Sequence, residues 1–136
     1  MKKARIKVNV VAAVLLVGVL CAGTLTAKAG GEYCMLENHY VGGETYAKSS
    51  TDVGMARTVS SSYAVHTGVH ANYEYYDSVS GNSRELTGSA HGFYGSEVTF
   101  SLPSGGERAS KISAEHHAEY NGQNWTCTTE AYFEEQ

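Results

Sequence analysis

Apolar and polar side chains alternate along residues 57–76, RTVSSSYAVHTGVHANYEYY. Most odd-numbered positions are apolar and most even-numbered positions are polar. Successive side chains of a strand point to opposite faces, so this period of two predicts β-structure with one buried and one solvated face. The residue types agree, because Val, Thr and Tyr favour strands. The segment therefore predicts part of an antiparallel sheet.

Two interpretations fit the constant odd parity of the buried positions between Val59 and Tyr75. The segment is either one long bent strand or two strands joined by a three-residue loop at 66–68, which would pair Val65 with Val69. We favour the loop, because strands of this length are unusual.

Two later turns contain dipeptides that favour β-hairpins. Gly81-Asn82 predicts a two-residue loop that would place Tyr73 opposite Ala90, and beyond it the buried positions become even-numbered, as such a loop requires. Asn121-Gly122 is a dipeptide that type I′ turns favour. This second turn would pair Tyr120 with Gln123, Ala118 with Trp125, His116 with Cys127, and Ile112 with Ala131.

The segment that precedes this sheet gives a weaker signal. Residues 32–40 form a short strand candidate that Gly42-Gly43 would end, and the polar residues 44–54 predict an exposed loop. The main sheet would then occupy about residues 55–133. One bare sheet cannot bury its own face, and glycines at 88, 92 and 95 predict a bend. We therefore expect an all-β fold, a small antiparallel meander of about six strands that forms a sandwich or a partly open barrel.

Residues 1–29 have the layout of a bacterial Sec-type signal peptide. Four basic residues lie between positions 2 and 7, residues 8–25 are almost uncharged and apolar, and Ala27-Lys28-Ala29 supplies the small-x-small cleavage pattern. An uncleaved membrane anchor is the alternative, since the apolar run is nearly long enough to span a bilayer. We expect cleavage after Ala29, secretion, and a mature single domain of residues 30–136 without a stable membrane anchor.

The mature chain would be acidic. Five of the ten basic residues leave with the signal peptide, and the five that remain face fourteen acidic residues, which gives a net charge of −9. Such a surface repels phosphate backbones and anionic lipids. We therefore expect no nucleic-acid partner.

Two cysteines remain in the mature chain, Cys34 and Cys127. In an exported protein such a pair most simply forms one disulfide bond, and the chain-entropy model assigns about 4 kcal/mol to a loop of this length. A reactive pair of thiols and an intermolecular bridge are the alternatives.

Six histidines are the main compositional excess. Strand parity places His66, His70, His91 and His117 on the outward face or at a loop, and it places His116 on the inner face. In the predicted register His70 and His91 lie close together, so they are candidate ligands for zinc or copper. The alternative is that the outward histidines are ordinary solvated residues and that His116 is a hydrogen-bonded core residue.

Aromatic residues are also abundant, with ten tyrosines and one tryptophan. Parity places Tyr73, Tyr75, Tyr94, Tyr120 and Trp125 on the core face, where they would pack the half-buried sheet. Any outward-facing tyrosine could instead stack on a sugar or on a protein partner.

No catalytic motif is present: the chain lacks G-x-S-x-G, H-E-x-x-H, a P-loop and a nucleotide fingerprint. Glu115 and Glu119 would share an outward strand face, where water prevents the raised pKa that a general acid needs. We expect no enzymatic activity, no catalytic residue and no cofactor.

These observations favour a secreted, non-catalytic β domain that acts by binding or surface contact, with a cell surface, a wall polymer or a protein as its partner. The segment TVSSSYAVHTGVHANY at 58–73 is similar in style to the small secreted β-sandwich bacteriocins of the lactococcin 972 type, which implies an antibacterial toxin as the alternative. No motif of that family aligns, and the longer acidic chain with its cysteine pair differs from the pattern. A second alternative is a secreted metal-binding protein that uses His70 and His91.

Overall fold

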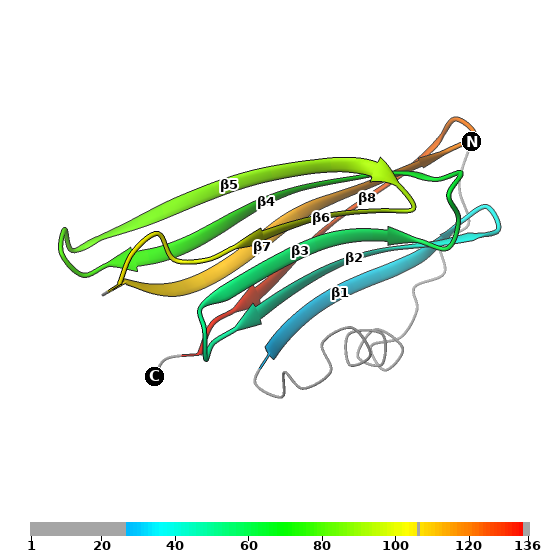
Figure 1. The fold of residues 1–136 in the computed structure, drawn as a ribbon. Helices are drawn as coiled ribbons and strands as arrows, with labels where there is room; N and C mark the ends of the chain where they lie inside the picture. Colours follow the sequence, from blue (N-terminus) through cyan, green and yellow to red (C-terminus); the bar gives the residue numbers. More distant parts are fainter. Residues whose placement is uncertain (1–26, 106, 135–136) are drawn as a thin grey trace.

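The computed structural model describes residues 27–105 and 107–134, which form eight antiparallel strands and no helix (Figure 1). Most of the predicted signal peptide lies outside these ranges, and the first strand begins at Ala27. Sheet A contains, in spatial order, β1 (Ala27–Leu36), β2 (His39–Lys48), β3 (Val53–Ser60) and β6 (Gly95–Phe100). Sheet B contains β5 (Asn82–Phe93), β4 (His66–Asp77), β7 (Glu107–Tyr120) and β8 (Gln123–Tyr132).

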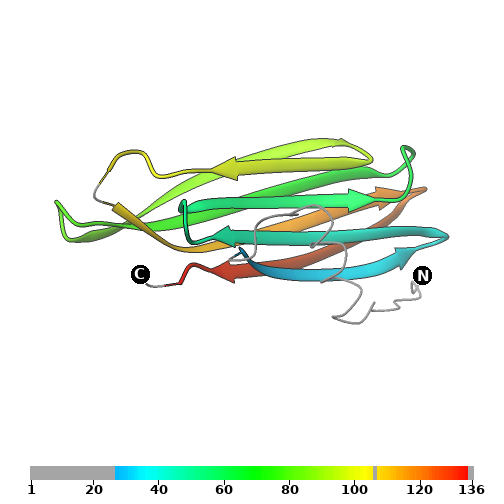
Figure 2. The same ribbon diagram turned by 60° about the horizontal axis from the view of Figure 1, so that its bottom comes forward.

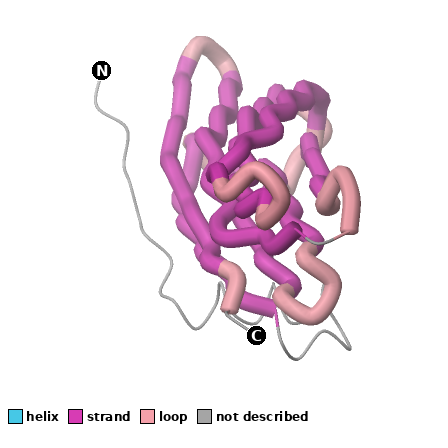
Figure 3. The backbone as a smooth tube through the Cα atoms, turned by 90° about the vertical axis from the view of Figure 1, so that its left-hand side faces the viewer, coloured by secondary structure: helices cyan, strands magenta, loops and turns pink. Residues whose placement is uncertain are grey.

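The two sheets pack face to face as two layers, which Figure 3 shows in a view along the strands. In Figure 2 the strands of both layers run in nearly the same direction, as in aligned β-sandwiches. The all-β prediction is confirmed. The described part has eight strands where about six were expected, and its sheets are not a simple meander, because β3 pairs with β6 and β4 pairs with β7.

The N-terminal part of the sandwich differs most from the prediction. Gly42 and Gly43 lie inside β2 and do not end it, and residues 44–48 continue this strand where an exposed loop was expected. Both glycines are needed for close packing. A Cβ at Gly42 would collide with the ring of Tyr33, and a Cβ at Gly43 would collide with the ring of His116.

Residues 61–65 form a loop that carries the chain from sheet A to sheet B. The predicted turn at 66–68 is therefore wrong, since these residues begin β4. The inward parity of β3 is also the reverse of the prediction. Thr58 is fully buried and Val59 is only half-buried. The core tolerates the Thr58 hydroxyl because it forms hydrogen bonds with the Gly68 carbonyl and with His116 Nδ1.

The hairpin at Asn121-Gly122 is confirmed residue by residue, from Tyr120 with Gln123 to Ile112 with Ala131. Both turn residues have positive φ, 51° and 76°, as a type I′ turn requires. The other hairpin has a longer loop, because Asp77 pairs with Asn82. Tyr73 consequently lies opposite Leu86 and not Ala90, a shift of four residues that leaves the inward face unchanged.

At the bend predicted in the long glycine-rich segment, the chain passes from sheet B to sheet A. β5 ends at Phe93 in sheet B, and β6 begins at Gly95 in sheet A. Tyr94 makes the corner with φ of 73°, its N–H donates to the Val65 carbonyl at 3.1 Å, and its carbonyl accepts from the Ser60 N–H at 2.8 Å. One edge of the sandwich is therefore closed by a continuous chain.

Two apolar clusters fill the space between the sheets, and buried polar residues lie among them. The larger cluster surrounds Tyr73 and Ile112, and the smaller one surrounds Leu36 and Trp125. Buried polar side chains include Thr45, Thr58, Thr67, His116 and Thr129. Among the described residues there is no helix that could cross a membrane.

Candidate functional site: a polar groove on sheet B

The outward face of sheet B carries four of the six histidines of the chain together with other polar side chains. No described strand packs on this face (Figures 1 and 3). The registers of the sheet place on it His66, Gly68, His70 and Asn72 of β4, Ser89 and His91 of β5, Ser113, Glu115 and His117 of β7, and Thr126, Thr128 and Glu130 of β8.

Two adjoining open hollows, of about 590 and 540 Å³, lie along this face. Both are lined by His70, Glu115 and Thr128, so they form one continuous groove. Imidazole, carboxylate, hydroxyl and amide groups line it. This groove is a candidate binding site because its polar groups converge on open space.

The two predicted metal ligands lie in this groove as diagonal neighbours. His70 pairs with Ser89 across β4 and β5, and His91 pairs with Gly68. His70 Nδ1 lies 2.6 Å from Ser89 Oγ. Within residues 27–105 and 107–134, no three His, Cys, Asp or Glu side chains are arranged to hold a metal ion. The structure thus brings His70 and His91 together on one face without completing a coordination shell.

Gly68 lies at the centre of the histidines. A Cβ at this position would lie 3.0 Å from His91 Nδ1 and 3.8 Å from His117 Cβ, so the absence of a side chain lets the His91 ring pack closely over Gly68. From the core side, Thr58 Oγ1 donates to the Gly68 carbonyl at 2.7 Å. The floor of the groove is therefore fixed by a hydrogen bond from the opposite sheet.

His116 lies beneath the groove and is 1% exposed, as predicted for a core histidine. Its Nδ1 is 3.0 Å from Thr58 Oγ1, and its Nε2 is 2.7 Å from Thr129 Oγ1. The Thr58 hydroxyl proton is already donated to Gly68, so His116 Nδ1 carries the proton and Nε2 accepts from Thr129. Burial lowers the pKa of His116 to about 4, which keeps the ring neutral.

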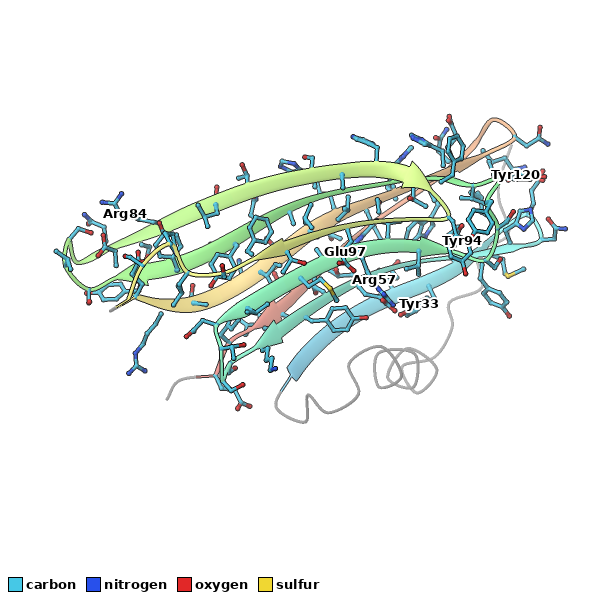
Figure 4. All side chains as sticks on the ribbon, viewed as in Figure 1. Tyr33, Arg57, Arg84, Tyr94, Glu97 and Tyr120 are labelled. Carbon is cyan, nitrogen blue, oxygen red and sulfur yellow. The ribbon has the colours of Figure 1, made fainter. Side chains whose placement is uncertain are left out.

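Exposed aromatic rings gather at one end of the sandwich, where β5 turns into β6. The rings of Tyr63 and Tyr94 are stacked with centroids 4.4 Å apart, and Phe93 lies against His66 at 5.2 Å. Tyr63, Phe93 and Tyr94 are 77%, 61% and 46% exposed. Figure 4 shows Tyr94 at this end of the molecule. The core position predicted for Tyr94 is wrong, because the corner at this residue turns its side chain outward.

The outward face of sheet A holds a charge cluster that sequence reasoning missed. Glu44 is fully buried, and its carboxylate accepts hydrogen bonds from the hydroxyls of Tyr33 and Tyr46 and from Arg57 Nε at 2.6 Å. Arg57, which is labelled in Figure 4, pairs with Glu44 directly across β2 and β3. Its pKa is raised: burial opposes the charged form, and the bonded Glu44 carboxylate more than compensates. The assumption that residues 44–54 were a loop concealed this pairing.

The described chain contains no disulfide bond, so the predicted link between Cys34 and Cys127 is absent. Cys34 is buried, and Cys127 packs against the same apolar cluster, beside Trp125 and Leu36. The packing of these apolar side chains between the layers joins the first and last strands without a covalent link.

The site therefore combines a polar groove, a histidine group centred on Gly68 and an exposed aromatic end, with a rigid, neutral His116 beneath the floor. Polar groups of this kind can hydrogen-bond a ligand and aromatic rings can stack on one. The chain matches no known protein-family model and no curated protein.

Proposed function

We propose that this chain is an exported, non-enzymatic binding domain that holds a hydroxyl-rich polymer of the cell surface along the groove of sheet B. The observation that carries the proposal is the continuity of the groove past His70, Glu115 and Thr128, at the surface of the sheet. An extended ligand fits an open groove better than a small molecule does, because small-molecule sites enclose most of their ligand.

The chemistry of the groove supports a glycan as the ligand. Ser113, Thr126, Thr128 and Asn72 supply hydroxyl and amide groups that both donate and accept hydrogen bonds. The stacked rings of Tyr63 and Tyr94 and the exposed Phe93 supply flat apolar surfaces at one end. Sugar rings have the matching character, with hydroxyls at their edges and apolar faces.

The charge of the chain narrows the choice of polymer. The mature chain predicted from the sequence has a net charge of −9, and Glu115 and Glu130 line the groove itself. Like charges repel, so polyanionic wall polymers are disfavoured. The backbone of a neutral wall glycan is the better candidate.

Sedimentation with insoluble cell wall tests this proposal. The chain starting at Gly30 should pellet with wall from which anionic polymers have been stripped. A Tyr63→Ala/Tyr94→Ala double variant should bind about 5- to 150-fold more weakly, since each aromatic contact contributes about 0.5–1.5 kcal/mol. Tyr76→Ala is the matched control, because Tyr76 is as exposed as Tyr94 but lies near the turn at residues 78–81.

Three outcomes would count against the proposal. Equal pelleting of the double variant and the wild type would show that the aromatic end does not take part. Release of soluble wall fragments would show that the protein is an enzyme. Failure to pellet, together with killing of related bacteria in a spot assay, would favour the antibacterial toxin instead.

A further inference from the structure

We infer that strand β5 is an interface at which two copies of this chain pair edge to edge, so that sheet B continues from one molecule into the other. β5 is the last strand of sheet B on its side and pairs only with β4. It lies along the upper border of sheet B in Figure 1. All its residues are exposed or half-buried, which is true of no other strand in the described chain.

One hydrogen bond identifies the backbone groups of β5 that face the open edge. Tyr94 N–H donates to the Val65 carbonyl at 3.1 Å. This bond lies one step beyond the last residue pair of the β4–β5 ladder. Because bonded and non-bonded pairs alternate along an antiparallel ladder, the even-numbered residues of β5 bond to β4. The odd-numbered residues direct their N–H and C=O groups to the open edge, namely Glu85, Thr87, Ser89 and His91 in the middle of the strand.

β5 lacks the features that keep exposed edge strands from pairing, which are short length, prolines, lysines and bulges. It is twelve residues long, contains no proline or lysine, and pairs with β4 without a register shift. Two other edges are less open, since β6 has six residues and the backbone of Glu130 on β8 packs against Gly30 of β1. A long open edge of this kind can add a strand from another chain.

The sequence of β5 is complementary to itself about Gly88. Two antiparallel copies with their Gly88 residues opposite each other would pair Leu86 with Ala90 on the inward side, and Thr87 with Ser89 and Glu85 with His91 on the outward side. Apolar groups meet apolar groups, hydroxyls meet hydroxyls, and a carboxylate meets an imidazole; such cross-strand pairs stabilise sheets. Moving the centre by one residue would place Glu85 opposite Ser89 or Phe93 and lose this match.

Charge also favours β5 as the contact between two copies. The predicted mature chain has a net charge of −9, so most of its surface repels a second copy. β5 carries one arginine and one glutamate, Arg84 and Glu85, and two copies can approach along it without net repulsion. Because the residues that match belong to the same strand, the partner is a second copy of this chain, related by a two-fold axis.

This pairing would set the orientation of the two grooves. The two-fold axis is perpendicular to the sheet, so the outward faces of both copies lie on the same side. Both grooves then open in one direction, and an extended polymer that contacts both would be held more tightly than by one. This consequence rests on the glycan ligand proposed above, whereas the pairing itself does not.

Sedimentation velocity of the chain starting at Gly30, over a concentration series from micromolar to millimolar, tests the inference. The wild type should pass from monomer to dimer as the concentration rises. Thr87→Pro should weaken the dimer at least about tenfold, because it removes an N–H at the centre of the interface from both copies. The variant should fold, since this N–H has no partner on β4, and circular dichroism verifies the fold.

Thr126→Pro is the matched control. Thr126 is an exposed threonine on β8, the edge strand at the other side of sheet B. The two-residue turn at 121–122 makes the flanking pair hydrogen-bonded, so the N–H of Thr126 points away from β7. This variant should dimerise as the wild type does.

Glu85→Lys is a second variant that leaves the backbone unchanged. Glu85 faces Glu74 on β4, so a lysine at this position replaces a like-charged pair with an opposite one and favours the folded monomer. Across the interface the substitution removes the carboxylate opposite His91. The dimer should therefore weaken at least about twofold.

A wild type that stays monomeric over the whole series would overturn the inference. So would a Thr126→Pro variant that weakens the dimer as much as Thr87→Pro does. An open series of larger species would also contradict it, because a two-fold interface closes with two copies. The Tyr63→Ala/Tyr94→Ala double variant should lose wall binding and keep the dimer, which separates this inference from the proposed function.

Discussion

His116 shows how a single residue fixes the centre of the sandwich. Its ring fits against Gly43 of sheet A, and its two nitrogens bond threonines of both sheets. Burial keeps the ring neutral near pH 7, and each hydrogen of this small network then has one assigned acceptor. Strand parity predicted its inward position, because parity depends only on the alternation around it. Parity could not predict its partner Gly43, which lies on a strand 73 residues earlier in the sequence.

The network makes stability depend on pH. The unfolded chain protonates His116 near pH 6.5, whereas burial lowers the pKa of the folded residue to about 4. Between these values the unfolded state binds more protons, so stability falls as pH falls through this window and is fully present above it. The loss attributable to His116 should approach about 3 kcal/mol at pH 4.

Urea unfolding of the wild type and of His116→Gln at pH 7, 5.5 and 4.5 measures this contribution. The variant should be less stable at pH 7 by about 1–3 kcal/mol, because hydrogen bonds in the core are lost. It should also lose less stability between pH 7 and 4.5 than the wild type. His39→Gln serves as the control for replacing a histidine outside this network, because the His39 ring packs on Tyr120. Identical pH dependence in all three chains would contradict the assignment.

At the scale of elements, local turn chemistry was a better guide than the alternation within strands. Asn121-Gly122 predicted its hairpin correctly because the two residues alone determine the register of the paired strands. Gly81-Asn82 predicted the correct faces but the wrong partners, since Asp77 accepts hydrogen bonds from the N–H groups of Val79 and Ser80 and stabilises a longer loop. Side-chain capping of this kind competes with the two-residue turn.

The type I′ turn at residues 121–122 gives a direct test of backbone conformation. Gly122 has φ of 76° and Gly105 does not have a left-handed φ, yet a Cβ at either position would meet no atom within 4 Å. Gly122→Ala should therefore destabilise the fold by about 1–2 kcal/mol through backbone strain alone. Gly105→Ala should be neutral or slightly stabilising. Thermal unfolding compares the two, and equal midpoints would refute the strain argument.

At the scale of the whole molecule, the sequence predicted an all-β fold whose strands have one buried and one solvated face, but it did not predict the order of the strands. Parity indicates which face of a strand is buried, and it says nothing about which distant strand lies beside it. The pairings of β3 with β6 and of β4 with β7 join residues far apart in the chain. The histidine group around Gly68 depends on both neighbours of β4, so only His70 and His91 could be placed together from the sequence.

Export is also a property of the whole chain, and we expect it to leave the sandwich intact. Cleavage after Ala29 would leave Gly30–Leu36 of β1, and each of these residues has a partner on β2. Intact mass spectrometry of protein from a bacterial culture supernatant should give a chain that starts at Gly30. A full-length chain retained in the membrane fraction would contradict this expectation.

The positions of the first and last strands allow the chain to be circularly permuted. Gly30 near the start of β1 packs against the backbone of Glu130 near the end of β8, at the same end of the sandwich (Figure 1). A short linker could therefore join these two ends. The chain could then be reopened in the exposed turn at residues 78–81. Such a circular permutant would keep six of the seven connections between the strands and every strand pair, while the new termini would lie far from the aromatic end.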